Sequence, residues 1–169
     1  DAGPRGSIEV DEKMQTTAPG VYCIGDANGR CLLAHAASAQ GVVAVQNALG
    51  KEAVENTIIP WAVYTFPEAA GVGTTEARAV EAGLPISVGM FPLGYLGKAM
   101  AAGHDEGFVK VTRNRETDEL LGVHIFGHNA TEMIHAAAAM ISAGGKAHDL
   151  ADMIFAHPTL SEGIKEAAE

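Results

Sequence analysis

Apolar and polar positions predict two structural regions in this chain, the first of them short. Residues 8–14 predict a short extended segment, and the apolar run 21–24 predicts a buried strand that stops at Gly25. Small residues between Leu33 and Leu49 predict a helix that approaches a sheet closely, and Gly50 ends it. A strand, a glycine turn and a helix in this order are typical of the edge of a nucleotide-binding α/β domain.

The second region combines short extended runs with helical patterns. We expect extended segments at residues 62–66, 70–73, 86–91, 108–112 and 120–126, the last two joined by a polar loop as a hairpin. We expect helices at residues 75–82, 131–143 and 148–155, and one more after Pro158. Strands followed by helices predict an α+β domain, with helices on one face of an antiparallel sheet. The change of pattern places a boundary near residues 50–60, between a first domain at 1–50 and a second at 51–169.

Composition and charge describe an ordinary folded protein. The 169 residues are 47% hydrophobic and 19% charged, which is enough apolar material for a core. The 11 basic and 21 acidic residues give a net charge of −10, which disfavours binding to nucleic acid or anionic membranes. No apolar run approaches the roughly 20 residues that cross a bilayer. The chain starts without methionine and without a signal-peptide pattern, so we expect it to be a piece of a longer protein.

The segment around His157 carries the clearest candidate chemistry. His157 precedes Pro158, and the carboxylate of Glu162 is within reach along the chain. A histidine beside a carboxylate transfers protons at neutral pH. A structural interpretation is equally open for Glu162 alone, because Thr159 followed three residues later by Glu162 is the pattern of a helix capping box.

Two further positions suit a ligand. Asp26 ends the first predicted strand, where a carboxylate accepts hydrogen bonds from ligand hydroxyls. Taken alone, Asp26 is more simply a turn residue bound to its own backbone. The residues Leu32, Leu33, Ala34 and His35 begin the predicted helix, whose free N–H groups and dipole suit negative charge. The alternative makes the two leucines core residues and the histidine a surface residue.

A metal site is the weaker interpretation of one histidine cluster. His128, Glu132 and His135 share helical spacing, and Glu-x-x-His recurs in di-iron bundles. Such bundles need two copies of the motif, and this chain has one. Asn129 and Glu132 also form a capping pattern, so we predict a helix start here and no metal.

Three motifs stand in a distinctive order along the chain, namely Thr17-Ala18-Pro19-Gly20-Val21-Tyr22-Cys23-Ile24-Gly25-Asp26, Leu32-Leu33-Ala34-His35 and Ala156-His157-Pro158-Thr159-Leu160-Ser161-Glu162. In this order they resemble the FAD-dependent pyridine nucleotide-disulfide oxidoreductases, over essentially the whole chain. Gly97-Lys98-Ala99 ahead of residues 106–111, together with Leu160, makes the chain most similar to the branch that oxidises dihydrolipoamide with NAD. The mercuric and glutathione reductases of the same family are the alternatives.

The resemblance implies a role for each candidate residue. It implies that Asp26 binds the ribitol of FAD, that the backbone of Leu32–His35 meets the flavin, and that His157 accepts a proton from the dithiol while Glu162 orients it. It also implies a homodimer in which each histidine serves the opposite subunit. The implied partners are lipoyl domains of 2-oxoacid dehydrogenase or glycine cleavage complexes.

The departures from the family pattern are equally informative. The chain lacks the family's Gly-x-Gly-x-x-Gly, its Cys-x-x-x-x-Cys redox pair and its NAD-binding domain. Cys23 and Cys31 have the wrong spacing to replace that pair, and two cysteines predict a reduced, cytoplasmic setting rather than a disulfide framework. The resemblance therefore implies a C-terminal fragment, with the tail of the FAD-binding domain at 1–50 and the dimerisation domain at 51–169. We expect the fragment alone to be inactive, and a dimerisation module without flavin is the alternative of a different class.

Overall fold

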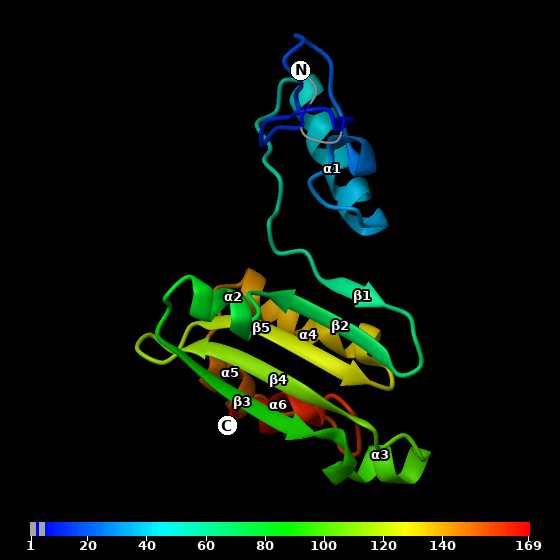
Figure 1. The fold of residues 1–169 in the computed structure, drawn as a ribbon, viewed down its shortest axis with the longest axis vertical. Helices are drawn as coiled ribbons and strands as arrows, with labels where there is room; N and C mark the ends of the chain where they lie inside the picture. The colour runs from blue at the N-terminus through cyan, green and yellow to red at the C-terminus, as the bar shows by residue number, and fades with distance from the viewer. Residues whose placement is uncertain (1–2, 4–5) are drawn as a thin grey trace. The chain divides into compact units, whose positions relative to one another are not determined.

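The structure, a computed structural model, describes residue 3 and residues 6–169. It divides between Thr57 and Ile58 into two units, which are described separately (Figure 1).

The first unit is organised around helix α1, Ala34–Ala48. The predicted helix is confirmed, and Gly50 beyond its end takes a left-handed φ of 76°. A short 3-10 helix, η2, spans Gly25–Asn28 and packs against α1. Met14 is fully buried against Val43 and Ala44 of α1, so this unit has a small core of its own.

The buried strand predicted at residues 21–24 does not form, and that prediction is wrong. A strand needs a partner along its length, and in the described part of the unit Tyr22 makes only an isolated bridge to Gln15. Residues 8–14 likewise form isolated bridges and no strand, among them the bridge of Val10 to Thr16. Val21 and Ile24 remain 52% and 42% exposed. The apolar run indicated burial, but it could not indicate which strand would pair with it.

The second unit is built on a five-stranded antiparallel sheet of order β1-β2-β5-β4-β3. The strands are β1 Trp61–Val63, β2 Glu68–Gly73, β3 Ile86–Pro92, β4 Gly107–Asn114 and β5 Leu120–Gly127. All five predicted extended segments, and the hairpin between the last two, are confirmed. Strand β1 is shorter than predicted and ends at Val63, ahead of the loop to β2.

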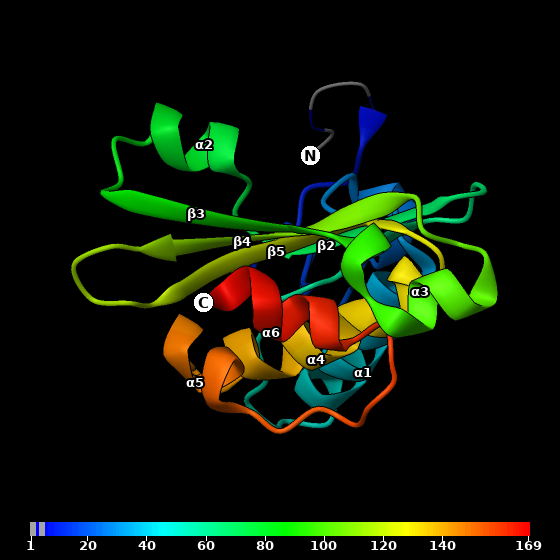
Figure 2. The ribbon, with the colours of Figure 1, turned by 90° about the horizontal axis from the view of Figure 1, so that it is seen from below.

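Three helices lie on one face of this sheet (Figure 2). Helix α4, Ala130–Ser142, packs on β2 and β5, while α6, Glu162–Ala168, packs on β3 and β4; α5, Ala147–Asp152, packs on α6. The α+β prediction is therefore confirmed. The short helix α2, Glu76–Glu81, lies on the other side of the sheet, and the six-residue α3, Gly97–Ala102, was missed. A further 3-10 helix, η3, spans Leu93–Tyr95.

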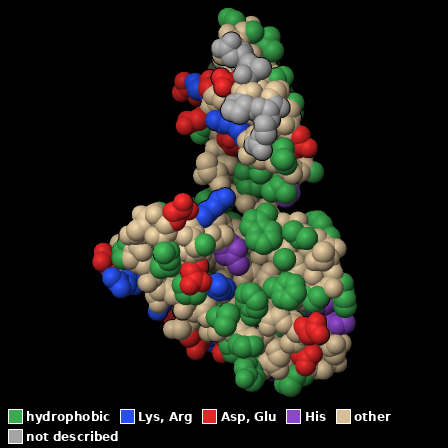
Figure 3. Space-filling model, in the orientation of Figure 1, with side chains coloured by type: hydrophobic (Ala, Val, Ile, Leu, Met, Phe, Trp, Pro, Cys, Tyr) green, Lys and Arg blue, Asp and Glu red, His purple; other side chains and the backbone are tan. Residues whose placement is uncertain are grey.

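The two faces of the sheet differ in what they bury. Val109, Val123 and Ile125 point toward the helices and are buried, together with Ile134 of α4 and Ile164 of α6. Side chains alternate along a strand, so Met90 and Phe126 point to the opposite face, where they are 60% and 39% exposed. Hydrophobic side chains gather on this face in the space-filling view (Figure 3). Across the described residues no helix is both long and apolar enough to cross a membrane.

Helix α4 begins differently from the prediction. Asn129 precedes it in a left-handed conformation, with φ 58°, and its side chain makes no capping hydrogen bond, so the predicted pairing with Glu132 is wrong. Instead Glu68 of β2 accepts hydrogen bonds from the Thr131 N–H at 3.0 Å and from the Thr131 hydroxyl at 2.8 Å. The cap is therefore a carboxylate distant in sequence, placed by the sheet.

Candidate catalytic and cofactor-binding residues

His157 and Glu162 form a hydrogen-bonded pair on the segment that leads into α6. The Nδ1 of His157 lies 2.8 Å from Oε1 of Glu162. The other carboxylate oxygen accepts the Thr159 N–H at 2.8 Å, so both oxygens are used. Leu160, between them, is buried in the core and anchors the segment. The side chain of His157 is 76% exposed and that of Glu162 is 21% exposed.

The electrostatics of the pair decide which ring nitrogen is protonated. The Thr159 N–H, and after it the hydrogen bond from His157, hold the pKa of Glu162 below its usual range. Glu162 is therefore ionised at neutral pH and can only accept hydrogen bonds. Nδ1 of His157 must then donate, which leaves Nε2 of the neutral ring as the proton acceptor.

The capping-box interpretation of this segment is only half fulfilled. Helix α6 starts at Glu162 with Ser161 at its N-cap, two residues later than a cap at Thr159 requires. The Thr159 hydroxyl donates to the Ala156 carbonyl at 2.7 Å instead of accepting from the helix. Only the bond from the Thr159 N–H to the Glu162 carboxylate matches the predicted box. The Glu162 carboxylate therefore binds both the His157 ring and the Thr159 backbone.

Asp26 lies in η2 with an exposed side chain. Its backbone carbonyl accepts the Gly29 N–H at 3.0 Å, which closes the turn. Within the described residues its carboxylate accepts no hydrogen bond, so the turn does not use this side chain as a typical Asx turn does. The carboxylate is left for an external donor.

The residues Leu32, Leu33, Ala34 and His35 lie at the start of α1. Leu33 is the N-cap in extended geometry, and in the described chain no side chain caps this helix. Leu32 is 69% exposed, so the alternative that it is a core residue is wrong; Leu33 is half-buried. Helix α1 and η2 pack together, so Asp26 and this helix start belong to one unit. An exposed carboxylate and a helix start in the same unit are both groups that a polar ligand can bind.

The histidines considered for a metal do not converge. His128 stacks on His104 with ring centroids 4.2 Å apart, and Nδ1 of His135 lies 3.3 Å from the Glu132 carbonyl. No group of three potential metal ligands occurs among residues 3 and 6–169. Cys23 is buried and Cys31 is half-buried, and both are free thiols.

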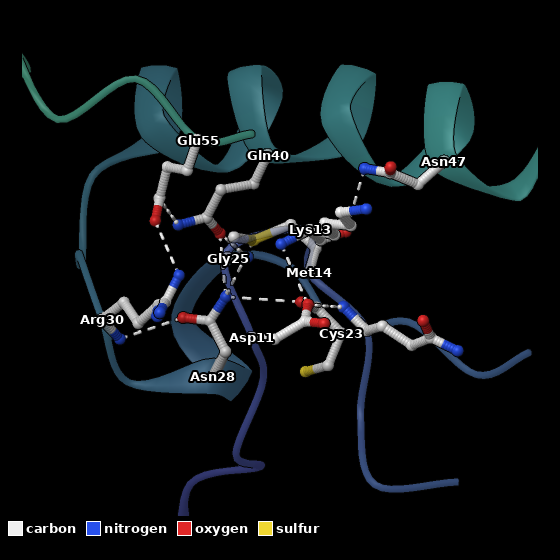
Figure 4. Close-up of polar contacts among 11 residues, drawn as sticks. Asp11, Lys13, Met14, Cys23, Gly25, Asn28, Arg30, Gln40, Asn47 and Glu55 are labelled. Atoms are coloured by element: carbon white, nitrogen blue, oxygen red, sulfur yellow. Dashed lines mark hydrogen bonds and ion pairs between the residues drawn. The ribbon is translucent and has the colours of Figure 1, made fainter. Parts of the chain in front are cut away.

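A partly buried polar cluster in the first unit was not predicted from the sequence; it is formed by Asn28, Arg30, Gln40 and Glu55, of which Asn28 and Gln40 are buried (Figure 4). Gln40 is fully buried on α1, among small apolar residues. The available signal was a polar side chain on the buried stripe of an otherwise apolar helix, because such a group needs partners.

Comparison with known proteins defines the class. Residues 59–168 match the dimerisation domain of the pyridine nucleotide-disulphide oxidoreductases, and residues 2–41 match a second pyridine nucleotide-disulphide oxidoreductase region. The chain belongs to this family.

Individual relatives with similar sequences are dihydrolipoyl dehydrogenases. The chain is 48% identical to the dihydrolipoyl dehydrogenase of Thermus scotoductus over 165 residues, which is 98% of this chain and 36% of the relative. It is 44% identical to the mitochondrial dihydrolipoyl dehydrogenase of Pisum sativum, covering 96% of this chain and 33% of the relative. The chain thus spans about a third of the length of these relatives.

Solved structures agree on the fold. LpdA from Mycobacterium tuberculosis superimposes with a TM-score of 0.92 at 29% identity, over 99% of this chain and 37% of that one. The HOCl-induced flavoprotein disulfide reductase RclA from Escherichia coli gives 0.91 at 26% identity, over 99% and 39%.

Proposed function

We propose that this chain is the C-terminal part of a dihydrolipoyl dehydrogenase. The complete enzyme would oxidise protein-bound dihydrolipoamide and pass the electrons to NAD through FAD and a redox disulfide that lies outside this chain. The first unit is then the tail of the FAD-binding domain and the second the dimerisation domain. The observation that carries the proposal is the 2.8 Å bond between His157 and an ionised Glu162.

His157 and Glu162 supply the acid–base chemistry in this proposal. A thiol with a pKa near 8.5 is mostly protonated at pH 7, and its thiolate is the reactive form. Nε2 of His157 accepts the thiol proton, while Glu162 holds Nδ1–H and stabilises the positive charge that forms. The thiolate would attack one sulfur of the redox disulfide and expel the other as an enzyme thiolate. The second substrate sulfur would then attack the substrate sulfur of this mixed disulfide and expel the remaining enzyme sulfur. The substrate disulfide forms as the enzyme disulfide is reduced.

The first unit fits part of an FAD site. The free, exposed carboxylate of Asp26 would accept hydrogen bonds from the ribitol hydroxyls, and the backbone of Leu32, Leu33, Ala34 and His35 would face the flavin ring. When bound, FAD relays two electrons from the enzyme dithiol to NAD. The rest of both cofactor sites lies outside this chain, so we expect the isolated chain to retain neither FAD nor NAD.

The proposed assembly is a homodimer with a two-fold axis. The match of residues 59–168 to a dimerisation domain supports it. In an isologous interface the same surface of both subunits is in contact. Each subunit can therefore place its His157 at the disulfide of the other. The proposed macromolecular partners are the lipoyl domains of 2-oxoacid dehydrogenase or glycine cleavage complexes. The free thiols Cys23 and Cys31 support a cytoplasmic location.

A dimerisation module is the second candidate for the chain by itself. It is favoured by one observation, that the chain spans about a third of its relatives' length. In that case the second unit would associate in pairs and carry out no turnover.

A substrate comparison tests the proposal. The complete gene product that contains this chain is assayed with dihydrolipoamide and NAD, with glutathione disulfide and NADPH, and with mercuric ion and NADPH. We expect turnover with dihydrolipoamide, and a turnover rate at least about 100-fold lower with glutathione disulfide or mercuric ion. An enzyme discriminates between substrates through contacts that only the correct substrate makes in full. Preferred reduction of glutathione disulfide or mercuric ion would contradict the assignment. The isolated chain serves as the control and should be colourless and inactive.

A further inference from the structure

Gln40 connects two segments that are distant in sequence (Figure 4). Its Oε1 accepts the Gly25 N–H at 2.7 Å and Nδ2 of Asn28 at 2.9 Å. Its Nε2 donates to Oε1 of Glu55 at 2.6 Å. The partners leave one orientation for the amide, because an N–H can only donate and a carboxylate can only accept. Every polar atom of this buried side chain therefore has a partner.

The bonds of Gln40 act on the turn that carries Asp26. They hold Gly25 and Asn28, the first and last residues of η2, with Asp26 between them. Gly25 has φ 68°, and a Cβ there would lie 3.2 Å from Cβ of Ala37. The turn is thus in a conformation that glycine favours, pressed against α1 and bonded at both ends.

Glu55 holds the other end of Gln40. Its Oε2 forms an ion pair with Nη1 of Arg30 at 2.9 Å, and its side chain is 15% exposed. The Glu55 N–H donates to the Glu12 carbonyl at 3.0 Å, which fixes the backbone of this segment. Glu55 stands two residues before the end of the first unit, so the Gln40 amide and Arg30 tie the segment leaving the unit to the Asp26 turn.

We propose that Gln40, oriented by Glu55, is a positioning residue for the flavin cofactor. It fixes the Gly25–Asn28 turn so that the Asp26 carboxylate is presented to the ribitol hydroxyls. The inference rests on the proposed function, since it requires FAD at Asp26. Gln40 itself touches no cofactor atom in this account.

An exchange of two side chains tests this role in the complete enzyme. Gln40→Glu places a carboxylate oxygen where Nε2 donates to Glu55, so two acceptors meet and the bond is lost. The double variant Gln40→Glu/Glu55→Gln restores a donor, because the new amide donates to the glutamate at position 40 and still accepts from Arg30. The matched control is Gln46→Glu, the same change at an exposed position of α1.

The readouts are the FAD dissociation constant and the visible circular dichroism of bound flavin, both measured where all variants are folded. A role in global stability alone would move neither. We expect Gln40→Glu to weaken FAD binding by at least about tenfold, as for an unmade buried hydrogen bond, and the double variant to recover most of that loss. Gln46→Glu should bind as the wild type does.

Two results overturn the inference and are distinguishable. If Asp26→Ala weakens FAD binding while folded Gln40→Glu does not, the positioning role is wrong and the flavin contact stands. If Asp26→Ala itself leaves FAD binding unchanged, the flavin contact of the proposed function fails, and the positioning role fails with it.

A second measurement keeps the role testable if Gln40→Glu does not fold. Gln40→Met removes all three hydrogen bonds of this side chain, to Gly25, Asn28 and Glu55, with little change in volume. In the chain itself it should speed hydrogen exchange of the Gly25 amide by at least about tenfold, since that N–H loses its acceptor. An unchanged exchange rate would overturn the proposed link.

Discussion

His157 and Glu162 are bonded through Nδ1 and Oε1 at 2.8 Å, and the same carboxylate is tied to the Thr159 N–H. The backbone bond and the imidazole bond both favour the ionised carboxylate. The orientation of the histidine is therefore coupled to the charge of Glu162. A neutral side chain of the same shape at position 162 would no longer couple a negative charge to the orientation of His157.

Glu162→Gln in the complete enzyme tests this coupling. We expect kcat for dihydrolipoamide oxidation to fall about 10- to 100-fold, because the charge that forms on His157 loses its partner. Stopped-flow reduction of the flavin by dihydrolipoamide measures the step directly. The control is Glu166→Gln on the exposed side of the same helix. Equal rates for the two variants would show that the Glu162 charge has no part in proton transfer.

The hydrogen bonds of the Asp118 carboxylate should make an acid-sensitive contribution to the free energy of unfolding. It has φ 61°, and its carboxylate accepts Nδ1 of His148 at 2.7 Å and the His148 N–H at 3.0 Å. The His148 N–H is the main cause that lowers its pKa from 3.8. A folded-state pKa below the unfolded value means that this stability is present above about pH 4 and is lost as pH falls through the lower, folded-state pKa.

We expect Asp118→Ala to lower the free energy of unfolding at pH 7 by about 1–2 kcal/mol, because a charged acceptor and a favourable left-handed residue are both lost. The difference from wild type should shrink as the pH falls below about 4 and through the folded-state pKa. Urea unfolding at pH 7, 4 and 3 measures it, with Asp152→Ala at an exposed position as control. A difference that stays constant with pH would contradict the assignment.

The start of helix α4 should depend on Glu68, a residue of strand β2 that caps it. Its Oε2 accepts both the N–H and the hydroxyl of Thr131. We expect Glu68→Ala to cost about 1–2 kcal/mol in the free energy of unfolding, the usual effect of losing an N-cap. Urea denaturation measures the change, and Glu132→Ala in the exposed first turn of α4 is the control. The prediction fails if the two variants are equally stable.

Much of the second unit was predictable because its pattern is local. Each strand from β2 to β5 contains a short stretch rich in apolar residues, and the β4–β5 hairpin is closed by its own polar loop. The strand expected at residues 21–24 failed because pairing depends on a partner that an apolar run does not specify. The α3 helix is no shorter than α2, which was predicted, but it begins at Gly97 after Leu96 and lacks a polar N-cap such as Thr75 of α2.

The same distinction between local and distant contacts holds for the candidate site. His157 and Glu162 are five residues apart, so their pairing followed from the motif. Glu68 and Thr131 are 63 residues apart, and Gln40 and Glu55 are 15 apart, so neither contact follows from spacing along the chain. In both cases the sequence shows a donor that needs a hydrogen-bond partner. Only the fold shows which acceptor that partner is.

The central claim is that Nε2 of His157 accepts the substrate proton, and His157→Gln in the complete enzyme tests it most directly. Glutamine keeps a hydrogen bond to Glu162 within reach but cannot take up a proton at neutral pH. The measurement is the rate of flavin reduction by dihydrolipoamide in a variant shown to retain its flavin. We expect this rate to fall at least about 100-fold with unchanged flavin content. A rate close to that of the wild type would contradict it.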